Sequence, residues 1–161
     1  MDTLTRQQRS ERMSRIKSKN TKPEQLVRRL LTLKGYRYRL HWKRLPGKPD
    51  IVFPGRKLAV FVHGCMWHQH DCGRYKQPKS NVEFWRAKLT ANVARDRRNQ
   101  RELHRLGWRY RIVWECQLRN PAAVSKRLVA FLGPVVGLQR VSNPRSADAR
   151  NSRAATRGLR P

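Results

Sequence analysis

Apolar positions recur along the chain in two rhythms, one typical of helices and the other of strands. Spacings of three and four residues predict helices over 21–34, over approximately 82–106 and over 121–132. Alternating or unbroken apolar runs predict strands at 36–40, 51–53, 58–62 and 108–114. The order helix, three strands, helix, strand, helix indicates an α/β fold, in which a mixed central sheet is flanked by helices.

Capping residues support the start of the first helix. Thr21 can act as its N-cap, Pro23 lies in its first turn, and Glu24 suits the positive end of the helix dipole. The apolar face of this helix is expected from Leu26, Val27, Leu30, Leu31 and Leu33. Gly35 can end the helix, because glycine readily adopts the left-handed conformation found after helix C-termini.

Two basic segments flank one predicted domain, which covers residues 21–133. Residues 1–20 carry six Arg and Lys side chains, and they are either an arm that contacts phosphates or a solvated tail. Residues 134–161 are rich in Pro, Ser, Asn, Ala and Arg without apolar periodicity, which predicts a basic, disordered tail. A length of 161 residues fits a single domain.

The charge balance points to a polyanionic partner. The chain has 38 Lys and Arg against 10 Asp and Glu, a formal net charge of +28. Nucleic acid is the expected partner, because each neutralised phosphate releases a counterion and strengthens binding. A membrane surface is the alternative, but no segment approaches the ~20 apolar residues of a spanning helix, and the first residues lack the apolar core of a signal peptide. We therefore expect a cytoplasmic, nucleoid-associated protein.

Cysteine and histidine residues concentrate in the segment after residue 62. Three cysteines cannot pair off evenly, and near histidines in a reducing compartment an odd set indicates metal binding. A Cys3His set meets the tetrahedral preference of structural zinc, and it can be formed by Cys65, His70, Cys72 and Cys116. The alternative is three unrelated thiols, because the spacing C-x4-H-x-C is not a common zinc-finger spacing.

The remaining histidines suggest a second centre around Asp50. Asp50 begins the strand at 51–53, and His63 follows the strand at 58–62, so a hairpin between these strands brings the two residues together. With His68, they can hold Mg²⁺, position a phosphate and accept a proton from water. The alternative is that Asp50 is a turn residue and the histidines are satisfied surface groups.

Seven motifs in this order resemble those of the very short patch repair endonuclease family. The resemblance spans approximately residues 5–119. The motifs are Leu45-Pro-Gly-Lys-Pro-Asp50, Phe61-Val-His-Gly-Cys65, Trp67-His68, Glu83-Phe-Trp85, Asn92-Val-Ala-Arg-Asp-Arg-Arg98, Leu106-Gly-Trp108 and Val113-Trp-Glu-Cys116. The resemblance implies a restriction-endonuclease-like core. It also implies Mg²⁺-dependent nicking of one DNA strand beside a T·G mismatch, which arises when 5-methylcytosine deaminates, as the start of very short patch repair.

The resemblance also assigns roles to individual residues. Asp50 corresponds to the metal-binding carboxylate, His68 to the general base and His63 to a support for the phosphate or leaving group. Glu24 matches an acidic residue near the metal waters, and Val62 stands where the metal takes a backbone carbonyl. The structural zinc ligands of the family fall on Cys65, His70, Cys72 and Cys116.

This sequence departs from the family pattern at Val62, where Thr is common, and at Met66, where an aromatic residue is common. The strand at 58–62 also lacks the second carboxylate and the lysine of many nucleases with this fold. Mismatch contacts are implied for Met66, Trp67 and Trp85 as wedges in the base stack, although they could instead be core residues. Core positions are expected for Trp108 and Trp114, and phosphate contacts or a solvated face for Arg95, Arg97 and Arg98.

Two other function classes fit part of the pattern. A non-catalytic, zinc-stabilised nucleic-acid-binding module explains the charge, the cysteines and the tryptophans, but it leaves Asp50, His63 and His68 without a role. A nuclease of the same fold that cuts intact duplex is the other. One active site in a small chain is compatible with a monomer that cuts one strand, and the resemblance suggests mismatch-repair proteins as partners.

Overall fold

The computed structural model describes residues 5, 7–8, 11, 19–75 and 77–135. Most of the predicted arm at 1–20, and the predicted tail from residue 136 onward, lie outside the described residues. Within the described part of the chain, no helix is both long and apolar enough to cross a membrane.

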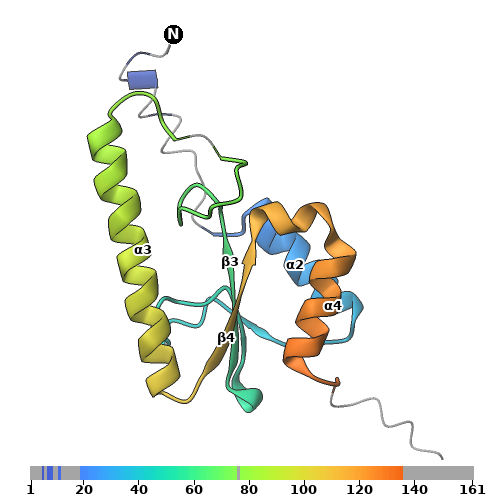
Figure 1. Cartoon of the computed structure of the whole chain (residues 1–161). Helices are drawn as coiled ribbons and strands as arrows, with labels where there is room; N and C mark the ends of the chain where they lie inside the picture. Colours follow the sequence, from blue (N-terminus) through green and yellow to red (C-terminus); the bar gives the residue numbers. More distant parts are fainter. Residues whose placement is uncertain (1–4, 6, 9–10, 12–18, 76, 136–161) are drawn as a thin grey trace, which may run out of the picture.

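Four strands form one mixed sheet in the order β1-β2-β3-β4 (Figure 1). The strands are β1 (Arg39–Leu40), β2 (Ile51–Phe53), β3 (Leu58–His63) and β4 (Arg109–Trp114). β2 and β3 pair antiparallel, because only the short 3₁₀ turn η1 (Pro54–Arg56) joins them. β3 and β4 pair parallel, as expected for strands that a long helical crossover connects. The predicted mixed sheet with β2 and β3 at its centre is confirmed.

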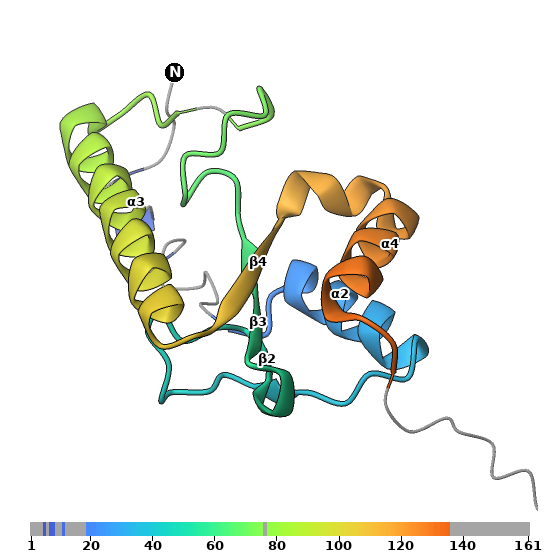
Figure 2. The same ribbon diagram turned by 60° about the horizontal axis from the view of Figure 1, so that its bottom comes forward.

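Helices cover both faces of this sheet (Figure 2). One face carries α2 (Lys22–Leu33) and α4 (Pro121–Leu132), whereas α3 (Val82–Arg105) lies along the other. A second 3₁₀ turn, η2 (Glu115–Arg119), leads from β4 into α4. The predicted helices therefore all form, and each end lies within one residue of the prediction.

Each sheet face has its own apolar core, which explains why the central strands are apolar throughout. On the α2 and α4 face, Ile51 and Val60 pack against Val27 and Leu128. On the α3 face, Val52 and Phe61 pack with Leu103, which is fully buried. Because successive strand residues point to opposite faces, a strand that is covered on both sides needs apolar residues at every position.

Two details differ from the prediction. The strand predicted at 36–40 forms only over Arg39–Leu40. Leu33 does not join the apolar face of α2, because its side chain is 73% exposed, whereas Leu31 is buried. Two residues separate them, which is about 200° around a helix, so Leu33 points away from the sheet when Leu31 points toward it.

We expect Leu103→Ala to destabilise the fold by about 2–5 kcal/mol, because it opens a cavity in the core between α3 and the sheet. The matched control is Leu106→Ala, since Leu106 follows the same helix and is 49% exposed. That variant should stay within about 0.5 kcal/mol of the wild-type chain. Urea unfolding followed by circular dichroism measures both. Equal losses from the two variants would contradict this assignment of the core.

Candidate active site

Asp50 lies immediately before β2, at the edge where the hairpin opens. Its Oδ2 atom accepts a hydrogen bond from the Val62 backbone N–H at 2.7 Å. Burial raises the pKa of this carboxyl to about 6, although the Val62 hydrogen bond opposes the shift. The carboxylate is therefore held in a place where its negative charge is costly, and a nearby cation would offset that cost.

Glu24 and His41 are the groups that surround Asp50 most closely. Each of the three residues offers one ligand atom, and these atoms lie within 4.8 Å of one another. Glu24 is buried at the start of α2, where it forms the predicted cap: Thr21 Oγ1 accepts the Glu24 N–H at 3.4 Å and donates its own hydrogen to Glu24 Oε1 at 2.9 Å. His41 lies beyond β1, and its backbone N–H donates to the Asp50 carbonyl at 3.3 Å.

His63 and His68 form a second cluster with Asp96. The two imidazole rings stack with centroids 3.7 Å apart and planes 6° apart. His68 Nδ1 lies 2.5 Å from Asp96 Oδ2, an acidic partner that α3 supplies. A neutral His68 that donates from Nδ1 to Asp96 keeps a lone pair on Nε2, and this is the arrangement of an oriented general base.

His63 is held as a neutral ring. Its side chain is buried, and burial together with the neighbouring His68 lowers its pKa to about 4. Its Nδ1 atom is buried and has no hydrogen-bond partner among the described residues. At neutral pH His63 can therefore offer a hydrogen bond to a bound group, but not a positive charge.

The structure divides the residues predicted as one centre, Asp50, His63 and His68, between two groups of ligand atoms. The ligand atoms near Asp50 come from Glu24 and His41, while the two histidines cluster with Asp96. The clusters are nevertheless neighbours, because the charge of His68 acts on the pKa of Asp50. Val62, which holds Asp50, is also the residue before His63 in β3.

Sequence reasoning missed His41 and the partner of His68. Asp96 lies within the basic run that was interpreted as a phosphate-contacting face, and it is the single acidic residue among Arg95, Arg97 and Arg98. A single carboxylate in a run of arginines was the signal that Asp96 has a role other than phosphate contact. His41 directly follows β1, and only the pairing of β1 with β2 brings it beside Asp50, so the sequence carried no local signal for it.

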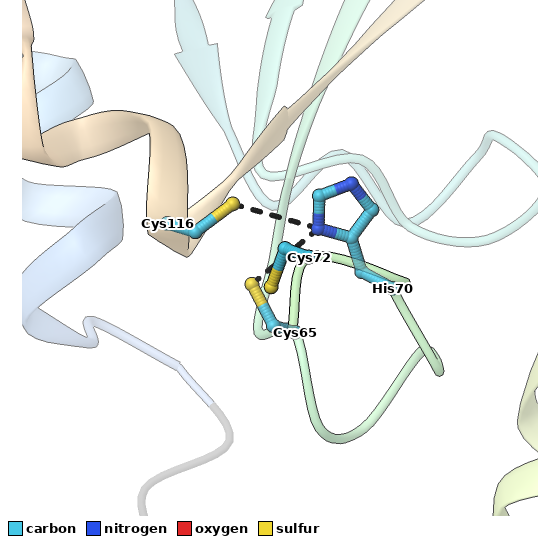
Figure 3. Close-up of side chains that lie close together, drawn as sticks. All are labelled: Cys65, His70, Cys72 and Cys116. Atoms are coloured by element: carbon cyan, nitrogen blue, oxygen red, sulfur yellow. Dashed lines mark hydrogen bonds between the residues drawn. The ribbon is translucent and has the colours of Figure 1, made fainter. Parts of the chain in front are cut away.

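The predicted Cys3His set is brought together (Figure 3). Its four ligand atoms lie within 4.8 Å of one another, with His70 Nδ1 at 3.7 Å from Cys65 Sγ and 3.5 Å from Cys116 Sγ. Burial raises the pKa of the Cys65 thiol to about 12, whereas the backbone hydrogen bond from Arg74 lowers the pKa of Cys72. The cysteines form no disulfide. Three sulfurs and one imidazole nitrogen around a common point are the donor set of a structural zinc site.

The tryptophans are placed differently from one another. Trp114 was expected in the core, but it is only half-buried, and its ring stacks on His70 with centroids 4.1 Å apart. Trp108 is half-buried and packs against the α3-side core, in agreement with the prediction. Trp67 and Trp85 contact each other with ring centroids 5.9 Å apart, and Trp85 is buried.

The other predicted DNA contacts are partly accessible. Met66 lines an open cavity of about 550 Å³ with Leu26 and Tyr75. The exposed aromatic on this part of α3 is Phe84, whose side chain is 56% exposed and packs edge-on against Trp85. The three predicted phosphate contacts, Arg95, Arg97 and Arg98, are exposed.

Comparison with known proteins supports a nuclease. A family model described as DNA mismatch endonuclease Vsr matches residues 1–74. The type II nicking enzyme V.XorIIP of Xanthomonas oryzae is 49% identical over 83% of this chain and 98% of that protein. The DNA mismatch endonuclease Vsr of Escherichia coli is 44% identical over 70% of this chain and 72% of that protein.

Among solved structures, the catalytic domain of the homing endonuclease I-Bth0305I aligns with a TM-score of 0.47 and 22% identity, over 70% of this chain and 94% of that one. That alignment is too weak to define the fold. The sequence relatives define the class of this protein, which is a DNA endonuclease. The chain belongs to the Vsr family of DNA mismatch endonucleases.

Replacing Asp50 with Asn should stabilise the protein at pH 8 in buffer without added divalent cations. The pKa of Asp50 is about 6 in the folded chain against an ordinary value of 3.8, so this group favours folding at low pH, and that contribution is lost as pH rises through about 6. Because Asn mimics the protonated acid, the free energy of unfolding of Asp50→Asn at pH 8 should be about 2–3 kcal/mol larger than that of the wild type. This gain should disappear near pH 4.

Urea unfolding at the two pH values measures this difference. Asp71→Asn is the control, because Asp71 is exposed and its substitution should change stability by less than about 0.5 kcal/mol. A variant Asp50→Asn that is no more stable than wild type at pH 8 would contradict the argument that burial makes the charge of Asp50 costly.

Proposed function

We propose that this endonuclease is Mg²⁺-dependent and nicks one DNA strand beside a T·G mismatch that arises from deaminated 5-methylcytosine, which begins very short patch repair. The observation that supports this most is the pair of neighbouring clusters in a member of the mismatch endonuclease family. One is a half-buried carboxylate with a raised pKa, and the other is a histidine oriented by Asp96. The first suits a divalent cation and the second suits proton transfer.

Asp50 is the proposed metal ligand, and the backbone carbonyl of Val62 and the carboxylate of Glu24 are further oxygen donors. Oxygen donors suit Mg²⁺, which keeps several waters and therefore tolerates few protein ligands. When bound, the ion would polarise the phosphate and lower the pKa of a coordinated water. The side chain at 62 adds no hydroxyl, so only its backbone can serve the metal.

His68 is the proposed general base, with Asp96 as the residue that orients it. Water attacks the phosphorus, its proton passes to His68 Nε2, and the phosphodiester bond to the leaving oxygen breaks. His63 stacks on His68 and restricts its rotation. As a neutral donor, His63 can support the phosphate or the leaving oxygen through one hydrogen bond, which refines the role that the family resemblance implies.

Structural zinc is the proposed occupant of the set Cys65, His70, Cys72 and Cys116. The segment that carries His68 lies between Cys65 and His70, and Cys116 belongs to η2 beyond β4. A zinc ion would therefore fasten this irregular segment to the end of the sheet and restrict the position of His68.

Mismatch recognition is proposed for the aromatic group that the loop and α3 form. Trp67 is the leading wedge, because it is half-buried, whereas Trp85 must be uncovered before it can enter a base stack. Lys88 Nζ lies 5.8 Å from the ring centre of Trp67 and 5.3 Å from that of Trp85. When these rings contact DNA, the positive charge of Lys88 therefore lies close to the phosphates. Met66 is proposed to assist with less stacking surface, and Arg95, Arg97 and Arg98 to contact phosphates.

Asp50→Asn should abolish Mg²⁺-dependent nicking of a T·G duplex while duplex binding stays nearly intact, because the variant loses the metal ligand but keeps the basic surface. A strand-nicking gel with labelled oligonucleotides and a binding titration measure the two properties. Asp71→Asn should nick like the wild type. Retained nicking by Asp50→Asn would remove the metal site from the proposal, and equal cutting of a fully matched duplex would favour a nuclease of intact DNA.

Cys116→Ser should lower zinc content and melting temperature together, because it removes one ligand of the set. Native mass spectrometry and a thermal melt of the same preparation provide the two values. We expect about one zinc per wild-type chain and a destabilisation of several kcal/mol in the variant. Unchanged zinc stoichiometry in Cys116→Ser would count against the four-ligand set.

A further inference from the structure

Arg28 places a positive charge among the acidic and imidazole groups that surround Asp50. It lies one helical turn after Glu24, and its side chain is 14% exposed. Its NH2 group lies 2.8 Å from Glu24 Oε2 and 3.1 Å from His41 Nε2, while NH1 donates to Asn20 Oδ1 at 2.7 Å. The charge of Arg28 also lowers the pKa of Asp50, although burial outweighs it.

This contact determines which nitrogen of His41 carries a lone pair. A guanidinium has only donors, so the contact with Arg28 at 3.1 Å requires a lone pair on His41 Nε2, and it is shorter than the 3.4 Å contact of the same nitrogen with Asn20 Oδ1, which would need an N–H. One imidazole lone pair and one carboxylate oxygen therefore converge on the same cationic nitrogen. The carboxylate of Asp50 lies within 4.8 Å of the ligand atoms of both Glu24 and His41. These three side chains are oxygen and nitrogen donors of the kinds that ligate divalent metals.

Arg28 is not fully satisfied in this position. Its Nε atom is buried and has no hydrogen-bond partner within the described part of the chain. A buried N–H group without an acceptor is unfavourable, so this position of Arg28 is only weakly stabilised. A divalent cation that binds Glu24 and His41 can therefore displace the guanidinium at little free-energy cost. Glu24 can accept such a cation without leaving its cap, because a carboxylate has about four acceptor positions and three hydrogen bonds to it are seen here.

We propose that His41 is a further protein ligand of the Asp50 metal centre, beside the oxygen donors named above, and that Arg28 is the counter-cation which a divalent ion displaces from it. This inference rests on the proposed function, since it assumes that Asp50 holds the metal. An imidazole ligand changes the selectivity of the centre. Mn²⁺ accepts nitrogen readily, whereas Mg²⁺ prefers oxygen, so the site should prefer Mn²⁺ through His41. The electrostatic repulsion from Arg28 should weaken binding of either ion.

The test measures metal binding by the zinc-loaded, full-length protein in the absence of DNA, at pH 8, where Asp50 is ionised. Free Mn²⁺ is followed by electron paramagnetic resonance, and Mg²⁺ by its competition with Mn²⁺. Zinc stays in place, because Mn²⁺ binds such ligands more weakly than zinc does. The variants are His41→Gln, His41→Ala, Arg28→Gln and Asp50→Asn. Arg29→Gln is the control, because it makes the same charge change at an exposed position of α2.

For His41, we expect Ala to weaken Mn²⁺ binding by about tenfold or more. Gln should reduce the preference for Mn²⁺ over Mg²⁺, since it replaces the nitrogen by an amide oxygen. For Arg28, we expect Gln to tighten the binding of both ions several-fold, whereas Arg29→Gln changes it by less than twofold. Far-UV circular dichroism confirms that each variant is folded.

Different results identify which claim fails. If Asp50→Asn removes Mn²⁺ binding but both His41 variants keep wild-type affinity and selectivity, the ligand role of His41 is wrong and the proposed active site stands. If Arg28→Gln binds metal no more tightly than Arg29→Gln, the counter-cation role is wrong. If Asp50→Asn binds Mn²⁺ like the wild type, the metal centre of the proposed function is itself refuted.

Discussion

The hydrogen bond from the Val62 N–H to the Asp50 carboxylate is the interaction on which the candidate active site depends. It requires the antiparallel register in which Ile51 lies opposite Val60. A shift by one residue would turn every side chain of a strand to the opposite face, and both cores of the sheet resist that change. The same strand continues to His63, which lies opposite Trp114 in the parallel pairing with β4. The register of the sheet therefore fixes the relative positions of the Asp50 cluster, the histidine cluster and Cys116, which follows β4.

Burial and charge act against each other around this contact. The chain is strongly basic, yet Asp50 and Glu24 are withdrawn from solvent at one end of the sheet, and the pKa of Asp50 rises as a result. Arg28 partly compensates the two carboxylates in the described structure. Two partly desolvated carboxylates are electrostatically costly without a divalent cation, and a bound ion would offset their negative charge. This arrangement is therefore suited to binding a divalent cation.

Features that follow from local pattern or from the kinds of residue present were predictable. Thr21 and Glu24 form the expected cap, the turn after Phe53 forms the expected hairpin, and the three cysteines with His70 converge as expected. The pairing of Asp96 with His68 was not predictable from periodicity, because 28 residues separate them and only the packing of α3 along the sheet brings them together. Periodicity indicates which face of a helix is apolar, but it does not name the neighbour of a polar side chain.

The same reasoning explains the remaining differences. His41 and Arg28 come from a loop and a helix that meet only because β1 pairs with β2. Leu33 shows the converse limit, since its apolar side chain suggested burial but is 73% exposed. The family motifs predicted more about function than local pattern could, because they assign residues that are far apart in the sequence to the same reaction.

In the proposed function the two clusters divide the chemistry, because Asp50 binds the metal and His68 accepts the proton from water. Single-turnover nicking of a T·G duplex over a range of Mg²⁺ concentrations tests this division most directly, in wild type and in His68→Gln. We expect the maximal rate to fall about 10²–10⁴-fold in the variant while the half-saturating Mg²⁺ concentration stays unchanged. A higher half-saturating Mg²⁺ concentration with an undiminished maximal rate would instead place His68 at the metal, and the proposed division of roles would be wrong.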